Sequence, residues 1–217
     1  MNEKILKNAI SEVLEHKNVV ESDINAMASL FGIERRKLDK KNLKKILIPA
    51  IQYRSGPLLN TQECIEIMKD FENKYPEIEN LLKNGNSQED LNKLLDIVNG
   101  ISNIGPKIAS VYLKDVIYQF KIGEQLIPYL YLPIDIHIKN IFVNKLQAID
   151  RDEMPNTSDK YSHYKNRPFQ EKLSQIHSPR VDFDMFWYIG GKFCSNRLFC
   201  DICWIKNYCK KRSPYKL

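Results

Sequence analysis

Four of the five cysteines of this 217-residue chain lie in one short segment, CSNRLFCDICWIKNYC. The spacing C-x5-C-x2-C-x5-C places four thiols on a single loop and so limits what the end of the chain can fold into. Structural zinc sites usually join two C-x2-C pairs, whereas a cubane cluster takes thiolates from several directions around one compact object. The spacing favours a [4Fe-4S] cluster over zinc, with a metal-free tail as the third alternative; the ligands would be Cys194, Cys200, Cys203 and Cys209.

The rest of the chain predicts a helical protein of the cell interior. No run of about eighteen apolar residues occurs, and the start, MNEKILKNAI, has the pattern of an amphipathic helix rather than a signal peptide. Thiols stay reduced inside cells, which favours metal binding or redox work for clustered cysteines. Cys64 stands apart from the cluster in a helical context, and we expect it to be a buried core thiol.

Apolar residues recur with helical spacing nearly throughout, and neither an internal repeat nor a strand pair is evident. The sequence therefore predicts an all-α fold. Asn60 with Glu63 indicates a capping box, Ser87 a second helix cap, and Pro76 the end of a helix. The predicted helices cover residues 5–14, 22–31, 40–52, 60–75, 87–99, 107–122, 135–146, 169–176 and 181–193.

Positive charge is concentrated in two stretches, although the net charge is only +6. Basic clusters of this kind suit a polyanion, and they equally suit a solvated helix face. The lysines and arginines concerned are Arg35, Arg36, Lys37, Lys40, Lys41, Lys44 and Lys45 in the first stretch, and Lys206, Lys210, Lys211 and Arg212 in the second.

The segment NGISNIGPK joins two predicted amphipathic helices by a tight hairpin. Gly and Asn tolerate the positive φ angles that such a turn needs. The turn also exposes backbone N–H groups at the start of the second helix, where phosphate binds without sequence dependence. The alternative is an ordinary αα-corner with a solvated Lys107. Further along, Asp135 precedes an apolar helix and is explained by N-capping alone, and His137 is expected to be structural or exposed.

Taken together, these motifs resemble the helix–hairpin–helix DNA glycosylases, specifically the endonuclease III branch with an iron–sulfur cluster. ISNIGPKIA is similar to that family's L-P-G-V-G-x-K-T-A hairpin, IDIH to its V-D-T-H motif, and FWYIGGKFC to the helix before its cysteine loop. The resemblance runs from about Leu43 to Cys209. It implies two helical lobes: residues 36–130 with the helix–hairpin–helix at 91–120, and residues 1–35 with 131–217, carrying the cluster loop at 194–209.

The resemblance also implies an activity, a base-excision repair glycosylase with apurinic-site lyase activity. Lys107 would attack the sugar C1′ of an extruded nucleotide, and Asp135 would activate the amine and balance positive charge. The partner would be double-stranded DNA containing a damaged or modified base. The protein would be a monomer without membrane contact. It would be found in a prokaryotic cytoplasm, associated with the nucleoid, or in another intracellular location. The implied DNA contacts are Gln52, which would fill the vacated stack, Asn103, Ile104, Gly105 and Arg197.

Some features depart from the family pattern. Asn103 stands where the hairpin has its first glycine, the first cysteine gap is one residue shorter, and residues 151–167 form a polar insert. The base removed stays open among oxidised pyrimidines, oxidised purines, mismatched thymine and hypermodified bases. One alternative is a monofunctional glycosylase. Another is a non-catalytic helix–hairpin–helix protein that binds DNA and carries an iron–sulfur cluster. A third is a DNA-binding protein stabilised by a zinc ion.

Overall fold

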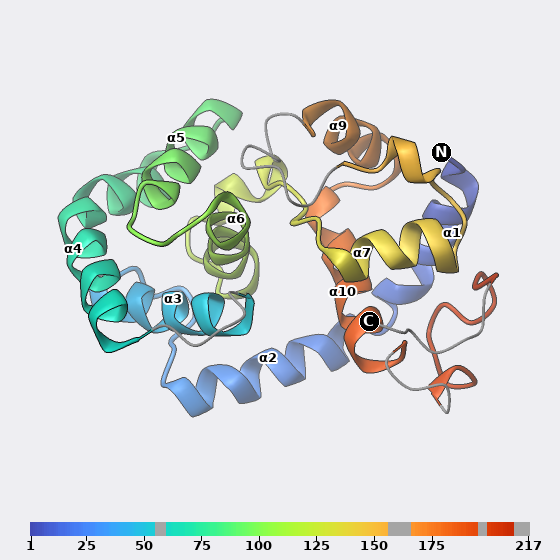
Figure 1. Ribbon diagram of the computed structural model, residues 1–217, viewed down its shortest axis with the longest axis horizontal. Helices are drawn as coiled ribbons and strands as arrows, with labels where there is room; N and C mark the ends of the chain where they lie inside the picture. The colour runs from blue at the N-terminus through green and yellow to red at the C-terminus, as the bar shows by residue number, and fades with distance from the viewer. Residues whose placement is uncertain (55–59, 156–165, 195–198, 211–217) are drawn as a thin grey trace. The chain divides into compact units, whose positions relative to one another are not determined.

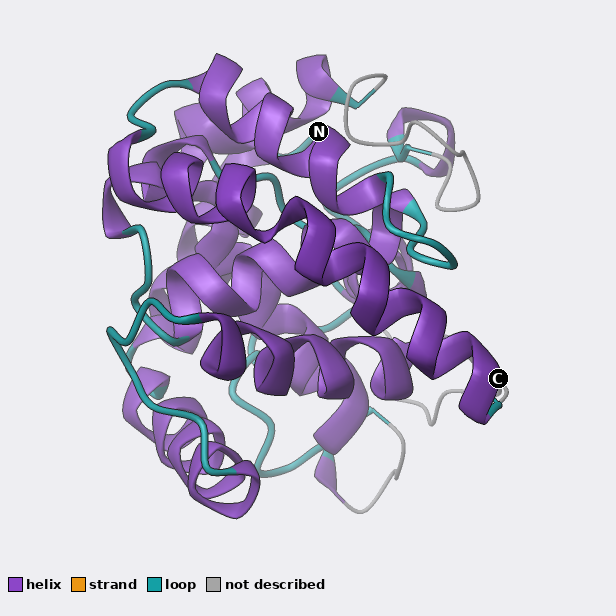
Figure 2. Cartoon of the chain, turned by 90° about the vertical axis from the view of Figure 1, so that its left-hand side faces the viewer, coloured by secondary structure: helices purple, strands orange, loops and turns teal. Residues whose placement is uncertain are grey.

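The computed structural model describes residues 1–54, 60–155, 166–194 and 199–210; of residues 52–54 it describes the backbone alone. The chain forms two compact units, one of residues 24–131 and one of residues 1–23 with 132–217 (Figure 1). The predicted lobes divide the chain after residue 35, whereas the observed units divide after Asp23, within a helix that runs through this point. Every regular element in the described ranges is helical, which confirms the all-α prediction (Figure 2).

The unit of residues 24–131 packs its helices around large buried side chains. Helix α5 packs against both α4 and α6, and α3 packs against α6. The rings of Phe71 and Tyr112 meet edge to face at 6.4 Å, and the Tyr112 hydroxyl donates to the carbonyl of Leu43 at 3.4 Å. The elements are the second half of α2 (Lys17–Phe31), α3 (Lys40–Arg54), α4 (Thr61–Asn84), α5 (Gln88–Asn99), α6 (Pro106–Lys114), the π-helical η1 (Asp115–Gln119) and the 3-10 turn η2 (Glu124–Tyr129).

Local sequence signals set most helix starts in this unit. Asn60 and Glu63 form the predicted capping box at the start of α4, and Ser87 caps α5 by accepting from the amide of Asp90. Helix α2 stops as predicted before Gly32, which has a φ of +59°. The same helix begins at Lys17, before the predicted start at residue 22.

Helix α4 continues through Pro76 to Asn84, so the prediction that it ends before this proline is wrong. A proline inside a helix forfeits a backbone hydrogen bond and costs about 3 kcal/mol. The apolar stripe of α4 resumes beyond the proline, where Ile78 and Leu82 are both buried. Burying a large aliphatic side chain contributes about 1.5–3 kcal/mol, so these two residues outweigh the cost of the proline.

The unit of residues 1–23 and 132–217 has a second core, dominated by aromatic rings. Phe142, Phe183 and Phe186 are fully buried and lie within 6.1 Å of one another, centroid to centroid. Helix α1 packs against α9 and α10. The described elements are α1 (Glu3–Leu14), the start of α2, α7 (Ile136–Lys139), η3 (Asn140–Lys145), η4 (Arg151–Glu153), α9 (Arg167–Ile176), η5 (Arg180–Asp184) and α10 (Met185–Lys192).

Candidate functional site: the hairpin and the cysteine segment

The predicted hairpin is present between α5 and α6 (Figure 1). Helix α5 ends at Asn99, with Gly100 as its C-cap, and α6 begins at Pro106. Asn103 has a φ of +60°, the left-handed conformation that asparagine tolerates better than most residues. The flanking Ile101 and Ile104 are buried, so the turn is anchored by two apolar side chains.

Helix α4 holds the hairpin from outside through Asp70. Its carboxylate accepts from the Ser102 amide at 3.1 Å and from the Ser102 hydroxyl. These two hydrogen bonds, the hydroxyl first, lower the pKa of Asp70 below its usual value, and Lys74 and Lys69 add a smaller electrostatic effect. The hairpin is thus fixed in place by a contact that depends on the ionised carboxylate.

The start of α6 leaves space around Gly105. A Cβ built on Gly105 would find no described heavy atom within 4 Å beyond its chain neighbours. Gly105 is the N-cap and offers no side-chain hydrogen bond to the first turn. Amides in the first turn of a helix have no acceptor within the helix, and here they belong to Gly105, Lys107 and Ile108. The amide of Ile104, by contrast, donates to the carbonyl of Ile101 at 3.0 Å.

Two lysines lie near the hairpin. Lys107 is exposed in the first turn of α6. From α4, the ammonium nitrogen of Lys74 lies 2.6 Å from the position that a Cβ on Gly100 would take. The sequence alone did not associate Lys74 with the hairpin, because its proximity arises from the packing of α4 on α5. The hairpin therefore combines backbone donors with positive charge from two helices.

The basic stretch of residues 35–45 contributes less positive charge than its sequence suggests. Its side chains are largely engaged with acidic or polar groups of the same unit, which offsets their field. The contacts are Lys37 with Glu34 and Asp39, Lys44 with Glu72, Arg36 with Glu124, Arg35 with Asn25, Lys45 with the Gly32 carbonyl, and Lys40 with the ring of Tyr75.

Asp135 lies in the other unit, where it caps α7 as predicted. Its Oδ1 accepts from the amides of His137 and Ile138 at 2.9 and 3.0 Å, and the residue is 4 % exposed. The extended segment before it is fixed by Gln170 of α9. The amide side chain of Gln170 bonds to both the N–H and the carbonyl of Leu132, at 2.9 and 3.0 Å.

His137 has a structural environment, as predicted. Its imidazole meets the ring of Trp187 edge on at 6.2 Å. A Cβ on Gly190 would stand 2.7 Å from the Cβ of His137, so only glycine at this position lets α10 approach α7 this closely. Packing of α10 against α7 thus holds the helix that Asp135 caps.

The four clustered cysteines share one small region. Cys203 is buried, and Cys194, Cys200 and Cys209 are partly buried. Burial, followed by the charges of neighbouring cysteines, raises the pKa of Cys194 to about 12 against an opposing effect of Lys145. Burial likewise raises the pKa of Cys203 to about 11, although the Ile205 amide opposes it. Cys194 and Cys203 are thus close enough to neighbouring cysteines for their charges to interact.

Among the described residues, no group of three or more His, Cys, Asp or Glu side chains is arranged to hold a metal ion. Thiols are nevertheless the donor type that thiolate-bound metal groups use. Four thiolates would repel one another, and a bound cation would relieve this repulsion and favour loss of their protons. These residues would hold the [4Fe-4S] cluster or zinc suggested by their spacing.

Aromatic contacts attach the cysteine segment to the helices of its unit. The indole of Trp204, directly after Cys203, stacks on Tyr188 of α10 at 5.4 Å and on His16 at 4.7 Å, between ring centroids. Ile205 is buried beside it. Lys206, which belongs to the second basic stretch, donates to the carbonyl of Asp201 at 2.9 Å.

Two of the implied DNA-contacting side chains lie outside the described residues. Gln52 belongs to α3, but its side chain is not described, and Arg197 falls in the undescribed range 195–198. The catalytic pair of the resemblance is split between the units, with Lys107 in residues 24–131 and Asp135 in the other.

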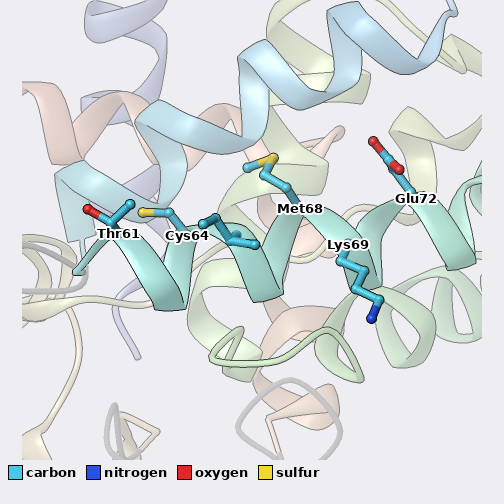
Figure 3. Close-up of a pocket in the computed structure, with 6 residues that line it drawn as sticks. Thr61, Cys64, Met68, Lys69 and Glu72 are labelled. Carbon is cyan, nitrogen blue, oxygen red and sulfur yellow. The ribbon is translucent and has the colours of Figure 1, made fainter.

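A shallow hollow of about 400 Å³ lies along the side of α4 (Figure 3). All six residues that line it come from this one helix, including Cys64, Ile65 and Met68. Cys64 is exposed, so the prediction of a buried core thiol is wrong. The helical pattern around Cys64 is correct, but the residue faces away from the core, which α4 meets through Ile67 and Phe71.

Comparison with protein families, with curated proteins and with solved structures finds no match to this chain. None of the helices in the described ranges has the length and apolar character needed to cross a membrane.

Proposed function

We propose that this protein binds duplex DNA through the hairpin at residues 100–106 and excises a damaged or modified base, with Lys107 and Asp135 as the catalytic residues. The observation that carries the proposal is the open space at Gly105. Packing within the chain does not require glycine there, because a Cβ would meet no described atom. A glycine at an open helix start is explained by the close approach of a ligand backbone.

Phosphate is the ligand that fits this position best. The first-turn amides of α6 point along the helix axis, where the helix dipole favours negative charge. Lys107 in the first turn of α6 and Lys74 beside Gly100 add positive charge to the hairpin. Contacts of this kind read the backbone of the nucleic acid and not its sequence, as expected of an enzyme that must scan many sites.

The resemblance to helix–hairpin–helix glycosylases supplies the catalytic step. The Lys107 amine, in its neutral form, attacks C1′ of the extruded nucleotide; the bond from C1′ to the base breaks and the base leaves with the bonding electrons. The C1′–O4′ bond of the resulting adduct then breaks, with a proton going to O4′, and the Schiff base that forms permits β-elimination of the 3′ phosphate. The resemblance gives Asp135 the role of receiving the amine proton, and in the structure Oδ1 of this residue caps α7.

The cysteine segment has a supporting role in this proposal. A [4Fe-4S] cluster held by Cys194, Cys200, Cys203 and Cys209 would supply a fixed scaffold for the loop and no step of base removal. A second candidate is a non-catalytic DNA-binding protein. It is favoured by Asp135, whose burial and two capping hydrogen bonds explain the residue without any chemistry.

Borohydride trapping distinguishes the two candidates. The protein is incubated with duplexes carrying an oxidised pyrimidine or an abasic site, and covalent adducts are measured after reduction. We expect an adduct with the wild type and none with Lys107→Ala, while binding to undamaged duplex persists. Asp135→Asn should trap nearly as poorly, because asparagine still caps the helix but accepts no proton.

Lys93→Ala is the matched control, since Lys93 is an exposed lysine of α5 paired with Glu89 at 3.0 Å. Its adduct yield should equal that of the wild type. An unchanged yield in Lys107→Ala would remove the lyase assignment. Binding without any adduct on any lesion would favour the non-catalytic candidate.

A further inference from the structure

Three aromatic side chains form a stack beside the cysteine segment. Trp204 lies between His16, at 4.7 Å and 13° between ring planes, and Tyr188, at 5.4 Å and 8°. The edge of Phe193 closes the stack at 5.2 Å from the indole. The central ring, Trp204, directly follows Cys203 in the chain, and one end of the stack is the phenol of Tyr188.

The phenol of Tyr188 has a base in place. Its hydroxyl donates to Oδ2 of Asp23 at 2.8 Å, and the Lys192 ammonium lies 3.5 Å from the same oxygen. Lys192 also lies over the Tyr188 ring, 5.5 Å from its centroid. The side chains of Asp23 and Lys192 are 51 % and 59 % exposed, so this end of the stack is at the protein surface.

The order of groups suits the movement of one electron and one proton. Indole and phenol are among the side chains that lose an electron most readily, and a phenol does so more readily when a hydrogen-bonded base takes its proton. A carboxylate that already accepts the O–H needs no rearrangement to receive that proton. Stacking of the two rings provides direct contact for the electron.

We propose that Trp204, Tyr188 and Asp23 form a redox relay that carries one-electron oxidation away from the cysteine segment to the protein surface. A strong one-electron oxidant, such as a ruthenium(III) complex, removes an electron from the indole of Trp204. Tyr188 returns an electron to the indole while its hydroxyl proton moves to the Asp23 carboxylate. The products are the reduced oxidant, a neutral tyrosyl radical and a protonated Asp23.

The relay is reset at the surface. A one-electron reductant of the ascorbate class donates an electron to the tyrosyl radical, and the proton returns from Asp23, which restores both side chains. The relay requires neither DNA nor a bound metal, so it goes beyond the proposed function and can fail or hold independently of it.

A second tyrosine in the chain supplies a matched control. Tyr75 donates to Glu79 at 2.9 Å, as Tyr188 does to Asp23. Burial, followed by the hydrogen-bonded carboxylate, raises the pKa of both phenols to about 12. The ring of Tyr75 lies against Phe71, 6.3 Å between centroids, whereas that of Tyr188 lies on an indole. Comparing Tyr75 with Tyr188 therefore separates the effect of the hydrogen bond on radical formation from the effect of stacking on an indole.

The test oxidises the purified full-length protein with photogenerated tris(bipyridine)ruthenium(III), followed by freeze-quenching and electron paramagnetic resonance. Ring-deuterated tyrosine identifies the tyrosyl radical. We expect a tyrosyl signal in the wild type and its loss in Tyr188→Phe, which keeps the stacked ring. Trp204→Phe should lose the signal too. Asp23→Asn should slow its appearance and abolish its solvent deuterium isotope effect.

Tyr75→Phe and Trp187→Phe should leave the tyrosyl signal unchanged, and thermal melting of every variant checks that it is folded. After a fixed dose of oxidant, Tyr188→Phe should lose more titratable thiol than the wild type. A tyrosyl signal of wild-type size in Tyr188→Phe would overturn the relay. Equal thiol losses in these two proteins would overturn its protective role.

Discussion

The hairpin at residues 100–106 and the cysteine segment at residues 194–209 are both short connections, yet different forces hold them in place. Two buried isoleucines and the contacts of Ser102 with Asp70 fix the hairpin. In the described part of the cysteine segment, burial of Cys203 and Ile205 and the stack on Trp204 hold the chain in place. The hairpin is complete without a ligand, whereas the cysteine segment has donors suited to a further component.

The glycines of the two units show the same contrast. A Cβ on Gly190 would stand 2.7 Å from the Cβ of His137, whereas a Cβ on Gly105 would meet no described atom within 4 Å beyond its chain neighbours. Packing of the fold requires glycine at position 190, whereas packing does not require it at position 105. Open space at a position with unused backbone donors is therefore the better indicator of a binding site.

The largest effect should follow from removing one cysteine ligand. In Cys203→Ala we expect complete loss of the proposed metal and increased amide exchange across residues 199–210, because the segment would then be held only by the burial of Ile205 and the stack on Trp204. Binding of undamaged duplex by the hairpin should persist. Metal analysis, hydrogen exchange and duplex binding measure the three effects. Full protection of the segment in a metal-free variant would show that the aromatic stack alone holds it.

Gly190→Ala should destabilise the protein by about 1–3 kcal/mol, because the new methyl group overpacks the contact with His137. Gly191 is the control: a Cβ there meets no described atom within 4 Å beyond its chain neighbours. Gly191→Ala should therefore be neutral or stabilise by up to about 1 kcal/mol, as expected for alanine in a helix. Urea denaturation measures both changes. Equal stability of the two variants would mean that α10 and α7 are packed less closely than the contact between Gly190 and His137 indicates.

A smaller effect concerns the pH dependence of the hairpin. The folded pKa of Asp70 is lowered, chiefly by the Ser102 hydroxyl, so the carboxylate stabilises the hairpin above its unfolded pKa, near 3.9. This contribution is lost as the pH falls through the lower folded value. We expect the protection of the Ser102 amide, relative to its intrinsic exchange rate at each pH, to fall in acid, and this fall to be weaker in Asp70→Asn. An identical acid response in the variant would assign the effect to another group.

Local chemistry made much of the fold predictable. Asn60, Ser87 and Asp135 each cap a helix as predicted, because a cap depends on a few neighbouring residues. The hairpin followed from Asn103 and the glycines around it for the same reason. Helix α4 passed through Pro76 because buried residues beyond it outweigh a local penalty, which a local signal does not reveal.

The surroundings of the candidate site were less predictable, since they depend on contacts between distant residues. Lys74 reaches the hairpin from α4, and Trp204 meets His16 from the far end of the chain. Cys64 shares the helical pattern of its neighbours but lies on the exposed side. The charge of residues 35–45 is offset by partners that only the folded unit brings together, such as Glu72 and Glu124.

The most direct test of the account is the pair of variants Gly105→Asp and Gly105→Asn, compared by melting and by duplex binding across a range of salt concentrations. Both side chains are good N-caps, so both variants should be at least as stable as the wild type. Only aspartate adds a charge that repels phosphate, and it should weaken binding roughly tenfold or more at low salt, with asparagine in between. Wild-type affinity in Gly105→Asp would contradict the claim that the hairpin binds the DNA backbone.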